Sequence, residues 1–359
     1  MNNLNKQKQR IEYLDALRGF TMLLVVFAHV ETYMLSIDPG ETFLSRLFLS
    51  FRMPLFFFIS GYLSFKEGII WTSGTWMTRV GSKIKIQLVP TMVFGALYTF
   101  LFSLGTIGDF IGNYHKFGYW FTISLLVMLL ILYTTNWIIH ATKVTSYKRL
   151  TSISLLLISS ALFLLKFVYD KSPSFAKISD YFCFHQVCVF FPFFTVGYLA
   201  SQYKDKFISF LNNDLIQFVI FVLFCFTFYT KGILSDRVCG SNDLLLIYRS
   251  IQDILIGIFG ICIVYNFFRK NSSLFSKDRF VGRQLQRIGS RTLDIYMLHY
   301  FFLTKIPISF NFNRGANMVC ELFYVAILAV FTTYCTLLVS DILRTSRSFS
   351  YYMFGASKK

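Results

Sequence analysis

The sequence predicts an all-α membrane protein: a polytopic helix bundle of about ten transmembrane spans, with both termini in the cytoplasm. Hydrophobic residues make up 55% of the 359 residues, and Phe alone accounts for 44 of them. Charged residues are only 15%, against roughly 25% in a soluble globular domain. This composition argues against a soluble domain and favours a chain that crosses a bilayer many times.

Apolar runs recur along the whole chain, each about 18 to 25 residues long, and a transmembrane helix needs about 20. They lie at 17–36, 47–65, 86–104, 118–141, 150–168, 183–201, 214–230, 244–268, 292–310 and 317–343. No Pro/Gly/Ser-rich linker or soluble-length insert separates them. We therefore expect one integral membrane domain over 1–359, with a cytoplasmic N-terminal segment (1–12) and a cytoplasmic tail (344–359).

The net charge of +17 is distributed unevenly between the connections. If the N-terminus is cytoplasmic, the inner connections hold 23 of the 35 Lys and Arg residues and the outer ones hold seven. Cytoplasmic loops of membrane proteins carry such an excess. The charge therefore indicates topology in a cytoplasmic (inner or plasma) membrane, with the lipid bilayer as partner and no nucleic acid.

The first apolar run holds two ionisable residues, Arg18 and His29. Eleven helical steps make roughly three full turns, so both side chains lie on one face, about 16 Å apart. Ionisable groups inside a span are costly and usually line a bundle interior, a cavity or a substrate path. Asp15 lies one turn before Arg18 and either orients it or is simply an acid at a helix N-terminus.

The second run contains FRMPLFFFISGY, with Arg52 two residues before Pro54. Proline removes one helical hydrogen bond and frees a carbonyl, which Arg52 could bind. A hairpin through the turn near residues 38–40 would place Arg52 and His29 within about 5 Å in depth, in a polar pocket in the outer half of the membrane. The simpler alternative is that Arg52 only snorkels or caps the proline break.

The remaining candidates lie farther along the chain. Arg79, Lys83 and Lys85 form a basic connection that topology alone could explain. Gln186 enters the sixth run from the outer side, and Tyr296 and His299 lie one turn apart in the ninth. His299 could line a pocket, share a proton with His29 or be structural. The seven cysteines show no CxxC spacing, so neither a metal site nor a disulfide framework is expected.

The motifs YLDALRG followed by His29, FRMPLFFFISGY and KIKIQLVP occur in that order, and the chain resembles the acyltransferase-3 family of integral membrane acyltransferases in them. GYWFTISLL, FPFFTVGYLA and IGSRTLDIYMLH are similar to later signatures of that family. The resemblance runs from about residue 11 to 300. The chain departs from the family's Arg-x-x-Arg pair, because it has Arg79, Lys83 and Lys85 instead.

The resemblance implies an O-acetyltransferase-like activity. An acyl group, most often acetyl, would move from cytoplasmic acyl-CoA to a hydroxyl of a sugar, a lipid-linked glycan or a cell-surface polysaccharide. The thioester is already activated, so such an enzyme mainly needs a base for the hydroxyl and a site for an anionic donor.

His29 is the candidate base, or else a nucleophile that is transiently acylated. Arg18, Asp15 and Arg52 complete the expected catalytic set. Arg18 with Arg79, Lys83 and Lys85 would bind the donor, because guanidinium and ammonium groups pair with phosphates. His299, Tyr296 and Gln186 are the expected substrate-binding residues.

A membrane transporter or flippase of a polysaccharide precursor remains the alternative, because broken spans and buried charge are also typical of transporters. No repeated halves are evident, which favours the acyltransferase.

Overall fold

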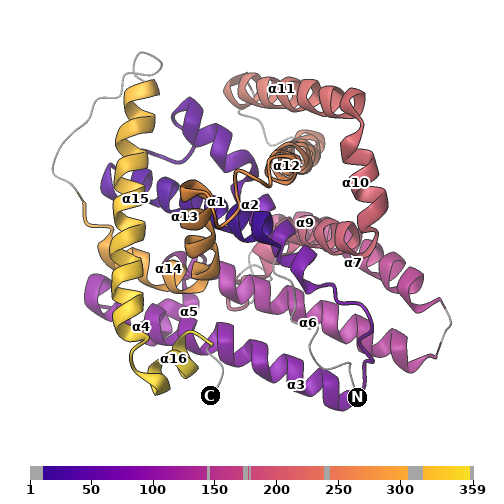
Figure 1. Ribbon diagram of the computed structural model, residues 1–359, viewed down its shortest axis with the longest axis horizontal. Helices are drawn as coiled ribbons and strands as arrows, with labels where there is room; N and C mark the ends of the chain where they lie inside the picture. The colour runs from indigo at the N-terminus through magenta and orange to yellow at the C-terminus, as the bar shows by residue number, and fades with distance from the viewer. Residues whose placement is uncertain are drawn as a thin grey trace.

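The computed structural model of the protein describes residues 11–143, 146–172, 177, 179–237, 243–305 and 318–355. All regular secondary structure in these ranges is helical (Figure 1). Nine helices within them are long and apolar enough to cross a membrane. The prediction of an all-α polytopic bundle is therefore confirmed. The side of the membrane on which the termini lie stays a prediction, and residues 1–10 and 356–359 lie outside the described residues.

Most of the long helices follow the predicted runs, and the helical stretch that contains the run at 86–104 begins earlier, at Ser73. The N-terminal half contains α1 (Glu12–His29), the π-helical turn η1 (Val30–Met34), α2 (Phe43–Ser64), α3 (Ser73–Lys83), the π-helical turn η2 (Ile84–Leu88), α4 (Val89–Ser103), α5 (Ile107–Gly112), the 3-10 turn η3 (Lys116–Gly118), α6 (Trp120–Ala141) and α7 (Tyr147–Lys171). The C-terminal half contains α9 (Phe184–Gln202), α10 (Lys204–Asn212), α11 (Asp214–Arg237), α12 (Asp243–Lys270), α13 (Phe280–Ser290), α14 (Thr292–Leu298), the 3-10 turn η4 (His299–Phe302), α15 (Met318–Leu343) and α16 (Arg347–Met353).

The run at 292–310 differs from the expected long span. Its described part is the short helix α14 followed by the 3-10 turn η4, and residues 306–310 lie outside the described residues. Tertiary hydrogen bonds explain the difference in part, because the side chains of Tyr296, His299 and Tyr300 bond to other segments. These contacts fix α14 and η4 against the end of α1 and the turn η3.

Local side chains begin several of the helices. The Thr42 hydroxyl accepts the Ser45 N–H at the start of α2, and Thr72 accepts the Thr75 N–H at the start of α3. A threonine at this position satisfies a backbone donor that has no partner inside the helix. The π-helical turn η2, which comprises the five residues before Val89, has a different origin. Pro90 has no N–H to donate to the preceding turn, so the regular α-helical hydrogen bonding is interrupted there.

Helices α1 and α2 lie in the middle of the bundle, with α15 and α11 at its edges (Figure 1). Glycines bring their neighbours into backbone contact. A Cβ on Gly61 of α2 would overlap the Phe194 carbonyl of α9, and a Cβ on Gly19 of α1 would overlap the Leu285 carbonyl of α13. Small residues at such crossings let membrane helices pack closely. Helices α1 and α2, which contain Arg18, His29 and Arg52, are therefore closely packed against α13 and α9.

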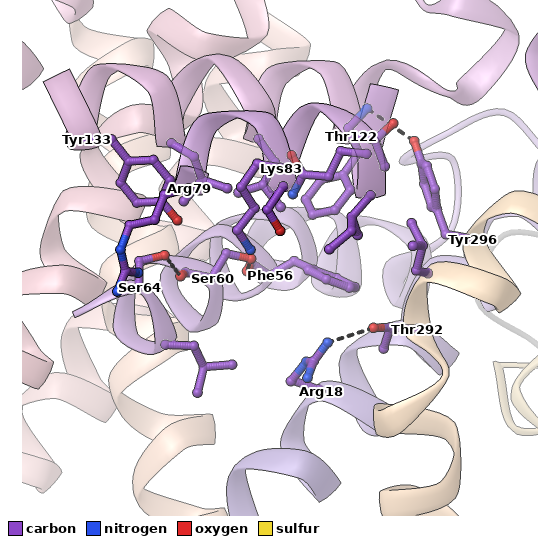
Figure 2. A pocket seen from close by; sticks show the side chains of 18 of the residues that line it. Arg18, Phe56, Ser60, Ser64, Arg79, Lys83, Thr122, Tyr133, Thr292 and Tyr296 are labelled. Atoms are coloured by element: carbon purple, nitrogen blue, oxygen red, sulfur yellow. Dashed lines mark hydrogen bonds between the residues drawn. The ribbon is translucent and has the colours of Figure 1, made fainter. Parts of the chain in front are cut away.

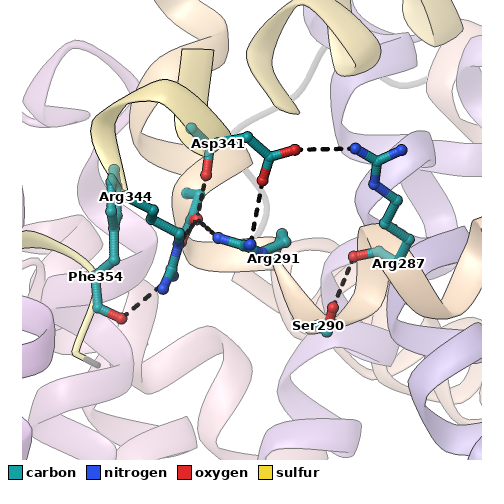
Figure 3. A network of polar contacts seen from close by, with 8 residues as sticks. Arg287, Ser290, Arg291, Asp341, Arg344 and Phe354 are labelled. Atoms are coloured by element: carbon teal, nitrogen blue, oxygen red, sulfur yellow. Dashed lines mark hydrogen bonds and ion pairs between the residues drawn. The ribbon is translucent and has the colours of Figure 1, made fainter. Parts of the chain in front are cut away.

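An ionic network ties α13, α14 and α15 together (Figure 3). The buried Asp294 carboxylate of α14 accepts two hydrogen bonds from the Arg344 guanidinium, at 2.7 and 2.8 Å, and a third from Arg291 at 3.3 Å. Asp341 pairs with Arg287 at 3.0 Å and with Arg291 at 3.1 Å. The network fixes the beginning of α14, on which Tyr296 lies.

Candidate active site

A cavity of about 560 Å³ lies between α2, α3, α6 and α14 (Figure 2). This volume falls within the range of small-molecule sites, which is roughly 300 to 1,000 Å³. Its apolar wall includes Phe56, Leu63, Phe121, Leu125 and Leu129. Hydroxyl groups of Ser60, Ser64, Thr78, Ser82 and Thr122 add hydrogen-bonding capacity.

The charged side chains that line the cavity are all cationic: Arg18, Lys66, Arg79 and Lys83. The lining residues, all of which belong to the described part of the chain, include no Asp or Glu. Arg79 and Lys83 are four residues apart on α3 and therefore share one face of that helix. A cavity with this lining suits a ligand that carries several negative charges.

Arg18 lies at the edge of the cavity formed by α1 and α14 (Figure 2). Its guanidinium donates a hydrogen bond to the Thr292 hydroxyl at 2.9 Å and lies 3.8 Å from the Asp15 carboxylate. Asp15 is thus placed where it can orient Arg18, as the spacing in the sequence suggested. Thr292 was not anticipated, since only the tertiary fold brings α14 beside α1.

Lys85 does not line the cavity. Its ammonium lies 2.7 Å from the centroid of the Tyr351 ring of α16. Residues two apart on a helix point in different directions, so Lys83 and Lys85 cannot both face the cavity. Of the four residues expected to bind the donor, the structure brings Arg18, Arg79 and Lys83 together and adds Lys66.

Tyr296 forms part of the cavity wall on α14. Its hydroxyl donates to the Gly118 carbonyl at 2.6 Å and accepts the Phe121 N–H at 3.1 Å. The Tyr296 ring lies 6.0 Å from the His299 ring. Tyr296 therefore stands between the cavity and the histidines.

His29 and His299 form a hydrogen-bonded pair, with 2.8 Å between His29 Nδ1 and His299 Nε2. His299 Nδ1 lies 2.8 Å from the Ile295 carbonyl oxygen. The Tyr300 hydroxyl lies 3.4 Å from His29 Nε2 and donates to the Gly118 carbonyl at 3.1 Å. His299 is fully buried, whereas His29 is partly exposed and is not among the residues that line the cavity.

The connection that carries Gly118 has an unusual backbone. Lys116 and Phe117 have φ of +48°, and Gly118 has φ of +98°. The buried Lys116 ammonium donates to the carbonyls of Ile111, Asn113 and Asp180 at 2.6 to 2.8 Å. Burial lowers the pKa of this ammonium below its usual value. A Cβ at position 118 would overlap the Tyr300 side chain, so glycine is required there by both conformation and space.

Arg52 lies close enough to His29, Glu31 and Tyr300 to interact with them electrostatically. This agrees with the depth argument that placed Arg52 beside His29. The described structure shows no hydrogen bond from Arg52 to the carbonyl that Pro54 leaves free. The buried Glu31 lies in the π-helical turn η1, which begins directly after His29.

The two π-helical turns coincide with the two parts of the site. Turn η1 follows His29, and η2 follows Lys83 and contains the cavity residue Gln87. Single π turns inside α-helices are frequently found at functional sites. Turn η2, between α3 and α4, is of this kind, whereas η1 ends the first helix.

Gln186 lies apart from both the cavity and the histidine pair. Its side-chain amide donates to the Tyr114 carbonyl at 3.4 Å, and its neighbour His185 bonds the Tyr114 hydroxyl at 2.5 Å. Gln186 thus anchors the chain between α5 and α6, and its expected contact with a substrate stays a prediction.

Sequence reasoning missed Lys66, Thr292 and Tyr300. Tyr300 directly follows His299, and that adjacency was the available signal. Among the described residues, no three His, Cys, Asp or Glu side chains gather as metal ligands would.

The model of a family described as an acyltransferase domain matches residues 11–341. The curated proteins offer no significant match, and neither do the solved structures. Since the family model covers nearly the whole chain, including both parts of the site, the protein belongs to the acyltransferase-3 family of membrane acyltransferases.

Proposed function

We propose that the protein is a membrane O-acyltransferase that moves an acyl group from acyl-CoA to a hydroxyl of a sugar, a lipid-linked glycan or a cell-surface polysaccharide. The observation that carries the proposal is the cavity whose charged lining is entirely cationic and which reaches Tyr296, beside the pair formed by His29 and His299. This chemistry requires a site for an anionic donor and, near it, a histidine that can act as a base.

The donor would enter the cavity from the end at Lys66, Arg79 and Lys83. These three side chains belong to α3 and to the connection between α2 and α3. The basic residues Lys66, Arg79, Lys83 and Lys85 of this region support a cytoplasmic location for it under the positive-inside rule. Acyl-CoA carries its phosphates at one end and its thioester at the other, so cations at the entrance leave the thioester to reach toward Tyr296.

His29 would be the base of the reaction. It would take the proton of the acceptor hydroxyl as that oxygen attacks the thioester carbonyl, and the thiolate of CoA would leave and take the proton back. General base catalysis of this kind contributes roughly 10²- to 10⁴-fold. The same geometry is compatible with His29 as a transiently acylated nucleophile.

The acceptor would reach His29 from a side other than the cavity. His29 is partly exposed but does not line the cavity, and the ring of Tyr33, which is 40% exposed, lies 5.8 Å from the His29 ring. Donor and acceptor would then approach from different directions, and the thioester would have to pass Tyr296 to reach the histidine. In a cytoplasmic membrane this would allow transfer to an acceptor in or beyond the bilayer.

The test is acyl transfer in membranes that contain the wild-type chain, His29→Ala or His140→Ala, with radiolabelled acetyl-CoA as donor. His140, at the end of α6, is the matched control histidine. We expect label in a carbohydrate or glycolipid fraction with the wild type and with His140→Ala, and none with His29→Ala. Movement of a saccharide across the membrane without any labelled product would overturn the proposal in favour of a transporter.

A further inference from the structure

The hydrogen bond between His299 and Ile295 determines where His299 carries its hydrogen. The Ile295 carbonyl oxygen can only accept, and it lies 2.8 Å from His299 Nδ1. His299 Nδ1 must therefore carry a hydrogen. In a neutral imidazole the other nitrogen then has a free lone pair, so His299 Nε2 is an acceptor.

The neutral form of His299 is the one that its surroundings favour. The side chain is fully buried, and its described contacts are with His29, the Ile295 carbonyl and the rings of Tyr296 and Tyr300. None of these groups is an anion. Burial of a charge is costly unless an opposite charge accompanies it.

The tautomer of His299 in turn determines which nitrogen of His29 carries the hydrogen. His299 Nε2 accepts, and it lies 2.8 Å from His29 Nδ1, so His29 Nδ1 carries the hydrogen. The lone pair of neutral His29 is then on Nε2, and this nitrogen is left to act as the base. Tyr300 does not block it, because its hydroxyl donates to the Gly118 carbonyl at 3.1 Å while its oxygen lies 3.4 Å from His29 Nε2.

We propose that His299 is a positioning residue, which fixes the tautomer of His29 through the Ile295 carbonyl and so makes His29 Nε2 the nitrogen that takes the acceptor proton. This inference rests on the proposed function. In the reaction, the hydroxyl hydrogen moves to His29 Nε2, the oxygen forms the ester as the C–S bond breaks, and the CoA thiolate recovers that hydrogen as a thiol. While His29 is charged, its Nδ1–H continues to donate to His299.

Two variants of His299 test the role through activity. Gln places a carbonyl oxygen near the position of Nε2 and can accept from His29 Nδ1–H, whereas Leu cannot accept. We expect His299→Gln to keep transfer within about threefold of wild type, and His299→Leu to lose on the order of 100-fold in kcat, the scale of general base catalysis. Both variants should bind CoA as the wild type does, since His299 does not line the cavity.

Equal losses in the two variants, with CoA binding intact, would overturn the proposal, because an acceptor at this position would then have no effect. Wild-type activity in His299→Leu would overturn it as well.

A second measurement does not depend on activity. The protein is labelled with ¹⁵N-histidine and reconstituted in lipid vesicles, and the ring nitrogen shifts are recorded with His29→Gln as the difference control. We expect His29 to show a protonated Nδ1 and an unprotonated Nε2, with the pattern kept in His299→Gln and lost in His299→Leu. A hydrogen on Nε2 of wild-type His29 would overturn the inference even if transfer is found. If the wild type transfers nothing, the proposed function fails, and these shifts still decide the tautomer.

Discussion

The ammonium of Lys85 lies 2.7 Å from the centroid of the Tyr351 ring. This contact directs Lys85 toward the C-terminal helix α16, while Lys83, two residues earlier, lines the cavity. Two lysines on one short segment are thus held in different environments. The pair offers a controlled test of the donor site.

Replacement of Lys83 by alanine should raise the KM for acyl-CoA about 10-fold or more. A hydrogen bond to a charged group contributes roughly 1.5 to 3 kcal/mol, and Lys83 would lose one to a phosphate. Replacement of Lys85 should leave KM within about twofold. Steady-state kinetics with acetyl-CoA measures both, and a larger effect from Lys85 would contradict the assignment of the cavity as the donor site.

Replacement of Asp294 by asparagine should destabilise the protein by about 3 to 5 kcal/mol, because one partner of a buried ionic network is removed. Arg344 would lose the carboxylate that accepts two of its hydrogen bonds. Asp341→Asn is the matched control. The Asp341 side chain is 43% exposed, against 1% for Asp294, and exposed pairs contribute only about 0 to 1 kcal/mol. Thermal unfolding in detergent compares the two, and equal shifts would show that burial of the network does not matter.

Replacement of Gly61 by alanine should sharply lower the yield of folded protein, because the new Cβ would overlap the Phe194 backbone of α9. Backbone atoms cannot move aside as a flexible side chain can, so α2 and α9 would separate. Gly81→Ala, inside α3, is the control, since its Cβ would meet no atom within 4 Å. Alanine there should be neutral or stabilise the helix by up to about 1 kcal/mol. Size-exclusion profiles of the solubilised variants give the comparison, and a monodisperse, wild-type profile for Gly61→Ala would refute the close packing.

Replacement of Tyr296 by alanine should relax selectivity for the length of the acyl group. Tyr296 stands between the cavity and the histidine pair, and its removal enlarges the space in which an acyl chain would lie. One methylene in an apolar pocket is worth roughly 1 to 3 kcal/mol, so the ratio of butyryl to acetyl transfer should rise about 10-fold. Tyr296→Phe keeps the ring and should preserve the wild-type ratio. A ratio that changes equally in both variants would implicate the hydroxyl instead of the ring.

The sequence predicted the features that depend on local pattern. Apolar run length predicted the nine long apolar helices found in the described ranges, and the helical positions of His29 and Arg52 predicted that these residues lie near each other. Contacts between distant segments could not be predicted in this way. The bonds of Arg18 to Thr292 and of Tyr300 to the Gly118 carbonyl join residues 274 and 182 positions apart, and no periodicity encodes them.

The shared helical face of Arg18 and His29 did not predict that only one of the two lines the cavity. Arg18 lines the cavity and His29 does not. Helix α14 runs beside α1 and places Tyr296 between the cavity and the histidine pair. The short length of α14 also depends on contacts between distant segments. Tertiary hydrogen bonds and the ionic network around Asp294 fix its position, and the hydrophobicity of the sequence predicts neither.

The π-helical turns at Val30–Met34 and Ile84–Leu88 have an evolutionary consequence. A π turn holds about one residue more than an α turn, so the loss of a single residue there would restore a regular helix without breaking the span. Because the wider turn already accommodates the extra residue, the residues on either side of the deletion would keep nearly the same orientation, and only side chains within the turn would change direction. Insertions and deletions of one residue, which are damaging in most transmembrane helices, could therefore re-aim Glu31 or Gln87 at low cost. Relatives whose chains differ in length by one residue at these turns are expected to keep the architecture and to differ in the molecules they accept.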